Sequence, residues 1–322
     1  MSRNESQVMG ALALRLRRTC FSLTTNVIQR SEATKNLSNT TKPMLDVSII
    51  IVHYNTPRLL RQTLKGIRRA NLHVSYEVIV VENDVKRGCV ETVRREFPEV
   101  QLVVNEKNLG FGVGMNTGFA RATGRYLLVF NPDIILSEGS LEKLVAFMDA
   151  RTDVGMVGPR LNNPDGSLQA SCYRFMEPKT VLYRRIPLLR SLPFAKRHLG
   201  AYLMNEWDHA EARDVDYLLG AAMLVRRKAL DMVGGFDPAY FVYFEDQDFC
   251  RRFWKAGWRV IYNPEATMIH YHRRETAEGH FFRQLFKPLT RIQLRSAVYY
   301  FKKYRGEKNP HTCLTQPTSF TK

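Results

Sequence analysis

The stretch Arg125-Tyr-Leu-Leu-Val-Phe-Asn-Pro-Asp133 decides the fold that this sequence predicts. Its residues 126–130 are apolar without alternation, a pattern typical of a strand buried on both faces of a sheet. Pro132 cannot continue a central strand, so we expect a turn that leaves Asp133 just past the strand's carboxyl end. Open α/β sheets bind ligands at that edge, where a carboxylate can hold a hard cation. The alternative is a capping role for Asp133 ahead of the helix predicted after Ser137.

Similar apolar runs occur upstream and indicate an α/β fold. Val47–Val52 and Glu77–Val81 predict two more buried strands, and residues 101–104 predict a short one. Helical patterns lie between them, from Thr56-Pro57 to about residue 70 and over residues 89–97. This alternation predicts a mostly parallel, doubly wound central sheet with helices on both sides.

Polar side chains follow the predicted strands where each one ends. The members of this set are Asn55, Glu82 with Asn83, Asp133, and Glu245 with Asp246. Because the carboxyl ends of parallel strands meet at one edge, these side chains are expected to outline a single crevice. Glu82 can accept hydrogen bonds from a ribose or a nucleobase there, and the alternative is a solvated acid in a loop.

A glycine-rich loop, Asn108-Leu-Gly-Phe-Gly-Val-Gly-Met-Asn-Thr-Gly118, precedes the strand predicted over residues 126–130. It is not a dinucleotide-binding fingerprint, because the third glycine position falls on Met115 or Thr117. A flexible loop that runs into a helix N-terminus can still approach a ligand closely. The alternative is a tight turn with close packing of helix on sheet.

The C-terminal half predicts a strand over residues 216–225, a short helix over 226–233, a helix over 249–256 and a last strand over 258–262. The acids Glu245 and Asp246 lie just before the helix predicted over residues 249–256. The helix dipole would stabilise ionised carboxylates there and keep one of them a competent base. Asp248 is expected to cap the helix or to pair with Arg251 or Arg252. His270 is predicted either to meet a metal or a diphosphate or to be structural.

Composition limits the partners and the compartment. The 322 residues contain 48 Lys and Arg against 31 Asp and Glu, a formal net charge of +17, which implies an anionic partner. The five cysteines are scattered and form no CxxC pair, so the sequence predicts neither disulfides nor a zinc cluster and fits a cytoplasmic location. No apolar run is long enough to span a bilayer.

Three regions are expected along the chain. Residues 1–44 form a basic extension, either disordered or lying on a membrane surface, and residues 45–275 form the α/β domain. Within that domain, residues 155–213 are expected to be an insertion that shapes an acceptor site. Residues 276–322 predict a basic, amphipathic helical tail, which either lies on an anionic membrane or packs on the domain.

The order of these motifs resembles the family 2 glycosyltransferases with the GT-A fold, and within them the rhamnosyltransferase-like group. The resemblance covers roughly residues 46–272. The segments that carry it are Val47-Ser-Ile-Ile-Ile-Val-His-Tyr-Asn55, Asn108-Leu-Gly-Phe-Gly112 with Asn116-Thr-Gly118, Asn131-Pro-Asp133, Gly220-Ala-Ala-Met-Leu-Val225, Gly234-Gly-Phe-Asp237 and Tyr243-Phe-Glu-Asp-Gln-Asp-Phe249.

The resemblance implies an inverting transfer of a sugar, such as L-rhamnose, from a dTDP- or UDP-sugar to a glycan or lipid-linked acceptor of cell-surface polysaccharide. It makes Asp246, beside Glu245, the general base. It places Mg²⁺ or Mn²⁺ on Asp133, with His270 as a further ligand. The positions that it assigns to the nucleotide-sugar are Val52, His53, Tyr54, Asn55, Glu82, Asn83, Asn108, Gly110, Phe111, Asn116 and Asn131.

The sequence departs from the family pattern at three places. Asn131 stands where a first acid of a D-x-D motif is usual, Glu82 stands where aspartate is usual, and no glycine-serine segment follows His270. The expected location is the cytoplasm, with attachment to the inner face of the plasma membrane as an option. The alternatives are a nucleotidyltransferase, a non-enzymatic nucleic-acid-binding protein and a catalytically inactive sugar-binding relative. No nucleic-acid partner is expected, because no zinc-finger or RNP pattern occurs.

Overall fold

The computed structural model describes residues 44–84, 86, 88–271 and 288–314. The predicted extension therefore lies outside the described residues up to position 43, as do the first and last parts of the predicted tail. Within the described ranges, no helix is both long and apolar enough to cross a bilayer.

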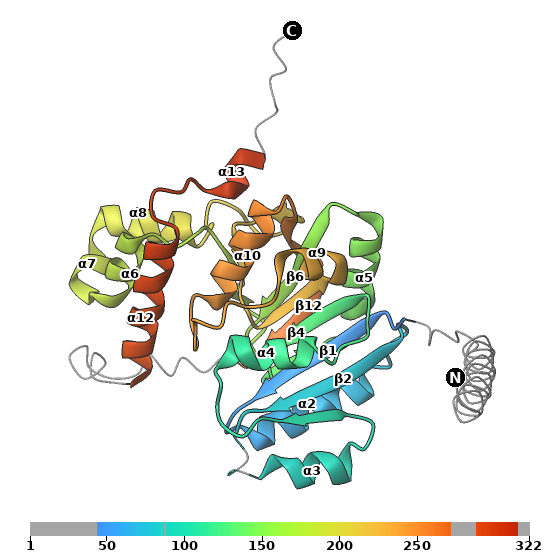
Figure 1. The fold of residues 1–322 in the computed structure, drawn as a ribbon. Helices are drawn as coiled ribbons and strands as arrows, with labels where there is room; N and C mark the ends of the chain where they lie inside the picture. Colours follow the sequence, from blue (N-terminus) through green and yellow to red (C-terminus); the bar gives the residue numbers. More distant parts are fainter. Residues whose placement is uncertain (1–43, 85, 87, 272–287, 315–322) are drawn as a thin grey trace, which may run out of the picture. The chain divides into compact units, whose positions relative to one another are not determined.

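Strands and helices alternate through the first half of the domain, as the sequence predicts (Figure 1). In chain order they are β1 Val47–His53, α2 Pro57–Arg69, β2 Tyr76–Glu82, α3 Cys89–Glu96, β3 Gln101–Val104, α4 Phe111–Phe119, β4 Tyr126–Phe130, β5 Ile134–Leu136 and α5 Ser140–Ala150. The second half continues with β6 Val154–Asn162, β7 Leu168–Gln169, β8 Cys172–Tyr173, α6 Pro178–Arg185, α7 Pro187–Ser191, α8 Pro193–Tyr202, β9 Arg213–Asp214, β10 Tyr217–Leu218, β11 Ala222–Arg226, α9 Arg227–Val233, α10 Glu245–Lys255, β12 Arg259–His270, α12 Pro288–Lys303 and α13 Pro310–Leu314.

One large sheet organises the domain, with strand order β3-β2-β1-β4-β11-β6-β12-β5. The pairs β2–β3, β1–β2 and β1–β4 are parallel, as is β6–β12. Strand β11 runs antiparallel to both β4 and β6, and β5 runs antiparallel to β12. The mostly parallel sheet is confirmed. The antiparallel β11 places its first residues beside the carboxyl end of β4.

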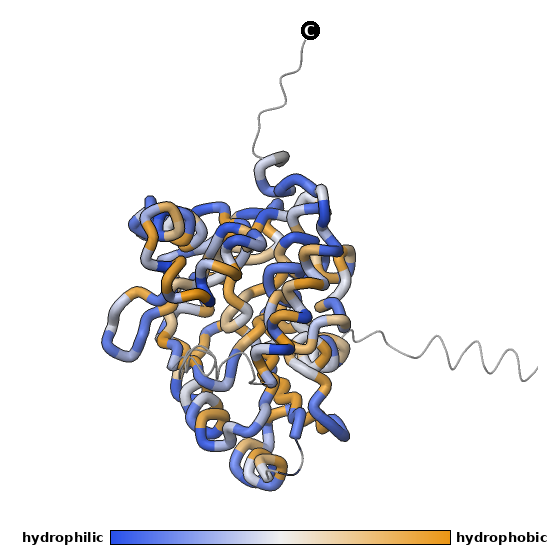
Figure 2. Tube along the Cα trace, turned by 90° about the vertical axis from the view of Figure 1, so that its left-hand side faces the viewer, coloured by the Kyte–Doolittle hydropathy of each residue, from blue (hydrophilic) through white to orange (hydrophobic). Residues whose placement is uncertain are grey.

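The unbroken apolar runs arise because both faces of the sheet are covered. In β1, Ile49 and Ile51 face one core with α2, α3 and α5, while Ile50 and Val52 face a second core with α4, α9 and α10. Helix α4 lies in front of the strands in Figure 1. In Figure 2 the hydrophobic segments run through the interior of the domain. A strand with helices on both sides has no solvent face, so its sequence does not alternate.

The structure corrects four predicted boundaries. Strand β6 is a member of the central sheet, so the region expected to be an insertion over residues 155–213 begins inside the sheet. The chain leaves the sheet after Asn162 and pairs with it again through β7 and β9. The strand predicted over residues 216–225 is divided into β10 and β11 at Gly220. Helix α10 begins at Glu245 rather than at Phe249. Strand β12 extends eight residues beyond Tyr262, to His270.

The C-terminal helix α12 packs on the domain through its aromatic side. Tyr300 is 2% exposed and Tyr304, just after the helix, is 8% exposed, and both belong to a buried cluster with Tyr240 and Phe244. Those rings are therefore not available to a bilayer. Of the two alternatives for the tail, the described residues support packing on the domain.

Candidate active site

The turn after β4 is held from three sides. The backbone N–H of Asn131 donates to Ala221 O, just before β11 (2.9 Å), and the hydroxyl of Thr63 in α2 donates to Pro132 O (2.7 Å). The N–H of Tyr271 donates to Asp133 O (2.9 Å). Asp133 therefore has a fixed position at the carboxyl edge of the sheet.

His270 lies beside Asp133, although 136 residues separate them in the sequence. The pairing of β12 with β5 aligns His270 with Ile134, and this brings His270 Nε2 to 3.3 Å from Asp133 Oδ1. His270 Nδ1 lies 2.6 Å from Gln169 Oε1, whose own amide nitrogen donates to Asn163. Since that oxygen only accepts, Nδ1 carries the proton, and a neutral His270 presents the lone pair of Nε2 toward the carboxylate.

This pair fits a divalent cation. Asp133 Oδ1 is buried, and no described residue donates a hydrogen bond to it. Two ligands of an octahedral cation, each about 2.1 Å from it, lie roughly 3 Å apart, close to the observed separation. Carboxylate oxygen and neutral imidazole nitrogen suit Mn²⁺ well, and the carboxylate alone suits Mg²⁺. The geometry of the pair is therefore compatible with a divalent cation, and metal binding by Asp133 and His270 stays a prediction.

Asp246 lies in the first turn of α10 and reaches the same edge through β11. Its Oδ2 accepts the N–H of Gly220 (3.2 Å), and its Oδ1 accepts the N–H of Gln247 (2.8 Å). Gly220 directly precedes Ala221, which holds Asn131. A Cβ atom at Gly220 would stand 3.2 Å from the Cβ of Asp246, so a glycine permits this close approach. Gly220 and Ala221 thus connect Asp246, the predicted base, to the turn that contains Asp133, the predicted metal ligand.

Burial dominates the electrostatics of the two acids. It raises the pKa of Glu245 well above its ordinary value, and the neighbouring Asp246 raises it further. Burial also raises the pKa of Asp246. The expected stabilisation of the ionised forms by the helix dipole is therefore outweighed by desolvation. For such a pair we expect one proton to stay with Glu245, while Asp246, with two backbone donors, ionises first.

The predicted nucleotide-binding residues at the ends of β1 and β2 are turned inward. His53 and Glu82 are both fully buried, and His53 Nδ1 lies 2.7 Å from Glu82 Oε2. Cys89 Sγ donates to the same carboxylate oxygen, and the N–H of Asp84 donates to Oε1 (2.8 Å). His53 Nε2 accepts the N–H of Thr56 (3.0 Å). The expectation that the side chain of Glu82 is open to a base or ribose is wrong for this conformation.

The glycine-rich loop is built for close packing. Gly110 has φ +85° and ψ 175°, and a Cβ there would stand 2.2 Å from Phe241 O. The Asn83 amide donates to Gly110 O (3.0 Å), and Asn108 Oδ1 accepts the N–H of Gly110 (2.9 Å). Asn116 accepts from and donates to the backbone of Phe236, at 2.8 Å in both cases. These asparagines hold the loop, and the tight-turn alternative describes it better than close approach to a ligand.

Other predicted contacts point outward or lie partly open. Tyr54 is 49% exposed, Asn55 is exposed in a left-handed conformation (φ +58°), and Phe111 and Asn131 are partly buried. Val52 is buried, so only its backbone is near the edge. For these residues, contact with a nucleotide-sugar stays a prediction.

A stack of tyrosines near the base was not predicted. The rings of Tyr202 and Tyr217 lie 5.3 and 5.0 Å from that of Tyr173, and the Arg184 guanidinium lies over Tyr202. Burial, then Tyr202, and then the charge of Asp246 raise the pKa of Tyr217, which indicates that the stack lies near this acid. The three tyrosines come from β8, α8 and β10, and no spacing in the sequence signals their convergence.

Comparisons with known proteins identify the family of this chain. The profile of the family described as "Glycosyltransferase like family 2" matches residues 43–293. The chain is 31% identical over 212 residues to N-acetylglucosaminyl-diphospho-decaprenol L-rhamnosyltransferase of Mycobacterium tuberculosis, covering 62% of this chain and 67% of that protein. It is 25% identical over 275 residues to rhamnosyltransferase WbbL of Escherichia coli K12, covering 80% of this chain and 94% of that one.

Solved structures share the fold. GalNAc-T7 with UDP, GalNAc and Mn²⁺ superposes with a TM-score of 0.54 at 13% identity, over 81% of this chain and 57% of that chain. The mannosyltransferase PcManGT of Pyrobaculum calidifontis, in complex with GDP-Man and Mn²⁺, gives a TM-score of 0.50 at 17% identity, over 94% and 89%. The fold is GT-A, and the chain belongs to glycosyltransferase family 2. This assignment argues against the nucleotidyltransferase and nucleic-acid-binding alternatives.

Proposed function

We propose that this glycosyltransferase inverts the anomeric centre of a sugar that it moves from a nucleotide-diphosphate donor to a hydroxyl of a glycan or lipid-linked acceptor. The observation that carries the proposal is the main-chain link from Asn131 through Ala221 and Gly220 to Asp246. This link fixes Asp133, the carboxylate that we assign to the metal, and Asp246, which we assign as the base, at one edge of the sheet. Inversion needs only these two functions, because a single displacement requires no covalent intermediate.

In this proposal, Asp133 and His270 hold Mg²⁺ or Mn²⁺, which neutralises charge on the leaving diphosphate when bound. Asp246 accepts the proton of the acceptor hydroxyl. Burial and the neighbouring Asp246 raise the pKa of Glu245, which favours its neutral form and limits the negative charge beside the base. Of the three stacked tyrosines, Tyr173 is partly exposed and can contact the acceptor, while Tyr202 and Tyr217 are buried and support its ring. The segment after β6 thus keeps the acceptor role predicted for it.

The nucleotide is expected at the ends of β1 and β2. The exposed residues Tyr54 and Asn55 can contact it directly. His53 and Glu82 are expected to act indirectly, by holding the loops that follow β1 and β2. Their buried pair accepts the backbone N–H groups of Thr56 and Asp84 in those loops. We assign the same indirect role to Asn83, Asn108 and Asn116, which hold the loop that carries Phe111.

The relatives named rhamnosyltransferases favour dTDP-L-rhamnose as donor and a polyprenyl-diphosphate glycan as acceptor, in the synthesis of a cell-surface polysaccharide. Calorimetric titration with dTDP, UDP and GDP, each with Mn²⁺, Mg²⁺ or EDTA, tests the donor site. We expect one nucleotide to bind at least about tenfold more tightly with a metal than with EDTA, since the cation bridges Asp133 and the diphosphate. If each of the three nucleotides bound with the same affinity in metal and in EDTA, the proposed site would be contradicted.

For a lipid-linked acceptor, we extend the proposal to an anionic membrane surface contacted by α6, α7 and α8. Leu182, Leu188 and Phe194 are 47%, 76% and 56% exposed on these three successive helices. Arg190, Lys196 and Arg197 are exposed on α7 and α8, so apolar and basic side chains are combined there.

Flotation with vesicles that contain phosphatidylglycerol tests this surface. The double variant Leu188→Glu/Phe194→Glu should lose most of the vesicle-bound fraction, because it places two charges where apolar side chains would enter the interface. Met232→Glu, at an apolar residue that is 62% exposed on α9, is the matched control. Equal flotation of the double variant and the wild type would exclude these helices as the membrane contact.

A further inference from the structure

The C-terminal helix α12 packs against the segment that leads into α10. The ring of Phe244, the residue before α10, lies 5.5 Å from the ring of Tyr300 and 5.8 Å from that of Phe301. The hydroxyl of Ser296 donates to Val242 O (3.0 Å). A part of the chain that follows all the family motifs thus contacts the entrance to the helix of the proposed base.

That entrance is strained. Tyr243 and Phe244 have φ values of +70° and +72°, in the left-handed region that aromatic residues rarely adopt. Such a conformation is unfavourable for a residue with a side chain and persists only where the surrounding structure imposes it. Asp246 follows two residues later, so the geometry of this turn sets its direction. Helix α12 supplies the packing that holds the turn.

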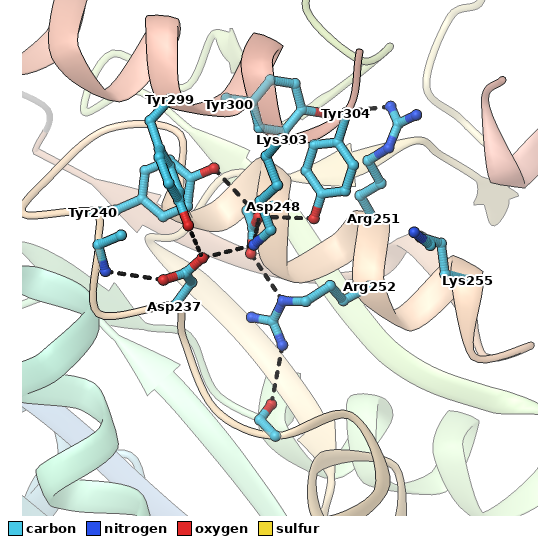
Figure 3. A network of polar contacts seen from close by, with 12 residues as sticks. Asp237, Tyr240, Asp248, Arg251, Arg252, Lys255, Tyr299, Tyr300, Lys303 and Tyr304 are labelled. Carbon is cyan, nitrogen blue, oxygen red and sulfur yellow. Dashed lines mark hydrogen bonds and ion pairs between the residues drawn. The ribbon is translucent and has the colours of Figure 1, made fainter. Parts of the chain in front are cut away.

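A polar network also connects α12 to the segment that leads into α10 (Figure 3). Lys303 Nζ donates to Asp237 Oδ2 (2.7 Å) and to Asp248 Oδ1 (2.6 Å). Asp248 is fully buried, and it also accepts from the Arg252 Nε (2.8 Å) and the Tyr304 hydroxyl (2.8 Å). Asp237 lies before the strained turn and Asp248 after it. The single ammonium of Lys303 therefore joins the two ends of the segment that contains the base.

The residues after α12 hold the opposite side of Asp246. Asp216 is buried just before β10, and its carboxylate contacts His311 Nδ1 (2.7 Å) and accepts from the Asn309 amide (2.9 Å). Strand β10 leads to Gly220, whose N–H holds Asp246. The C-terminal segment thus fixes both chain segments that meet at the base.

We propose that Lys303 is a positioning residue for Asp246. In this proposal, α12 holds the turn before Asp246 and so contributes to the acceptor side of the active site. The inference rests on the proposed function in one respect, the role of Asp246 as base. Removing the ammonium would leave Asp248 paired with Arg252, so the helix and the fold should persist. The turn between Asp237 and Asp248 would lose the ion pairs that Lys303 makes with both ends, and it would relax although Arg252 still bonds Asp248 and Gly235 O.

The test compares Lys303→Met with Lys302→Met in the full chain, because Lys302 is the exposed neighbour on the same helix. Hydrogen exchange of peptides over residues 236–250 should become faster in Lys303→Met alone. With dTDP-L-rhamnose as donor and a polyprenyl-diphosphate glycan as acceptor, the kcat for release of dTDP should fall about 10- to 100-fold while the KM for the donor stays within about twofold. A displaced base slows proton removal from the acceptor hydroxyl without changing the donor contacts. Lys303→Arg should restore most of the rate, because it keeps the charge between the two carboxylates.

The two measurements separate the inference from the proposed function. Unchanged exchange in Lys303→Met would overturn the positioning role, whatever the enzyme transfers. Faster exchange with an unchanged kcat would overturn it as well. If the wild type released neither dTDP from dTDP-L-rhamnose nor UDP from UDP-N-acetylglucosamine, the proposed donor class would fail, while the exchange data would still decide whether Lys303 holds the turn.

Discussion

Asp246→Asn should lower kcat for sugar transfer by about 10²- to 10⁴-fold, the usual contribution of a general base, and leave nucleotide affinity nearly unchanged. The amide keeps the shape of the carboxylate and can still accept the N–H of Gly220, but it cannot take a proton from an acceptor hydroxyl. Because donor contacts are assigned to other residues, calorimetric titration with the nucleotide should give a wild-type dissociation constant. Transfer is measured as release of the nucleotide in the presence of acceptor.

The thermal stability of Asp246→Asn shows whether the loss of kcat comes from the missing base or from unfolding. Burial raises the pKa of Asp246 in the folded protein, so the ionised carboxylate destabilises the fold at any pH above its unfolded pKa. A neutral amide removes that cost, and the melting temperature at neutral pH should therefore stay or rise. Asp231→Asn, at an exposed acid on α9, is the control and should change neither rate nor melting temperature. Wild-type turnover in Asp246→Asn would remove this residue as the base.

The raised pKa also predicts a pH dependence. A base must be ionised to act, so kcat should increase with pH through the folded pKa of Asp246. This acid limb should lie at higher pH than for a solvent-exposed aspartate.

The strands could be predicted because their signal is local. Val47–His53 and Tyr126–Phe130 are continuous apolar runs, and only a sheet covered on both faces requires them. The contact between Asp133 and His270 could not be derived from spacing, since it depends on the pairing of β12 with β5. The family resemblance placed both residues at the metal, and the structure brings their side chains together.

The remaining differences have long-range causes. Four residues of α10 were missed because the turn at Tyr243 and Phe244 is unfavourable by itself and is imposed by α12. Glu82 reads as an open acid, yet His53 and Cys89 surround it because two parallel strands end side by side. The glycines of the loop predicted close approach to a ligand. At Gly110 the space is filled by the backbone of Phe241, more than 100 residues away.

Asp133→Ala should weaken metal-dependent binding of the donor nucleotide by about 10- to 100-fold or more. The cation would lose its carboxylate ligand, and His270 alone, a neutral donor, cannot balance the charge of the diphosphate. The residual affinity should be the same in Mn²⁺ and in EDTA. For the wild type, EDTA should reproduce the affinity of the variant, because both changes remove the same bridge between protein and diphosphate.

The controls for this prediction are an exposed acid after β5 and the second proposed ligand, His270. Glu138→Ala removes an exposed acid five residues further on and should leave the metal dependence intact. His270→Ala should weaken binding less than Asp133→Ala in Mg²⁺ and comparably in Mn²⁺, since imidazole is a ligand for Mn²⁺ more than for Mg²⁺. An Asp133→Ala protein that still bound the nucleotide more tightly with metal than with EDTA would place the cation elsewhere. In that case, the short distance between Asp133 and His270 would be an ion pair that holds β5 against β12.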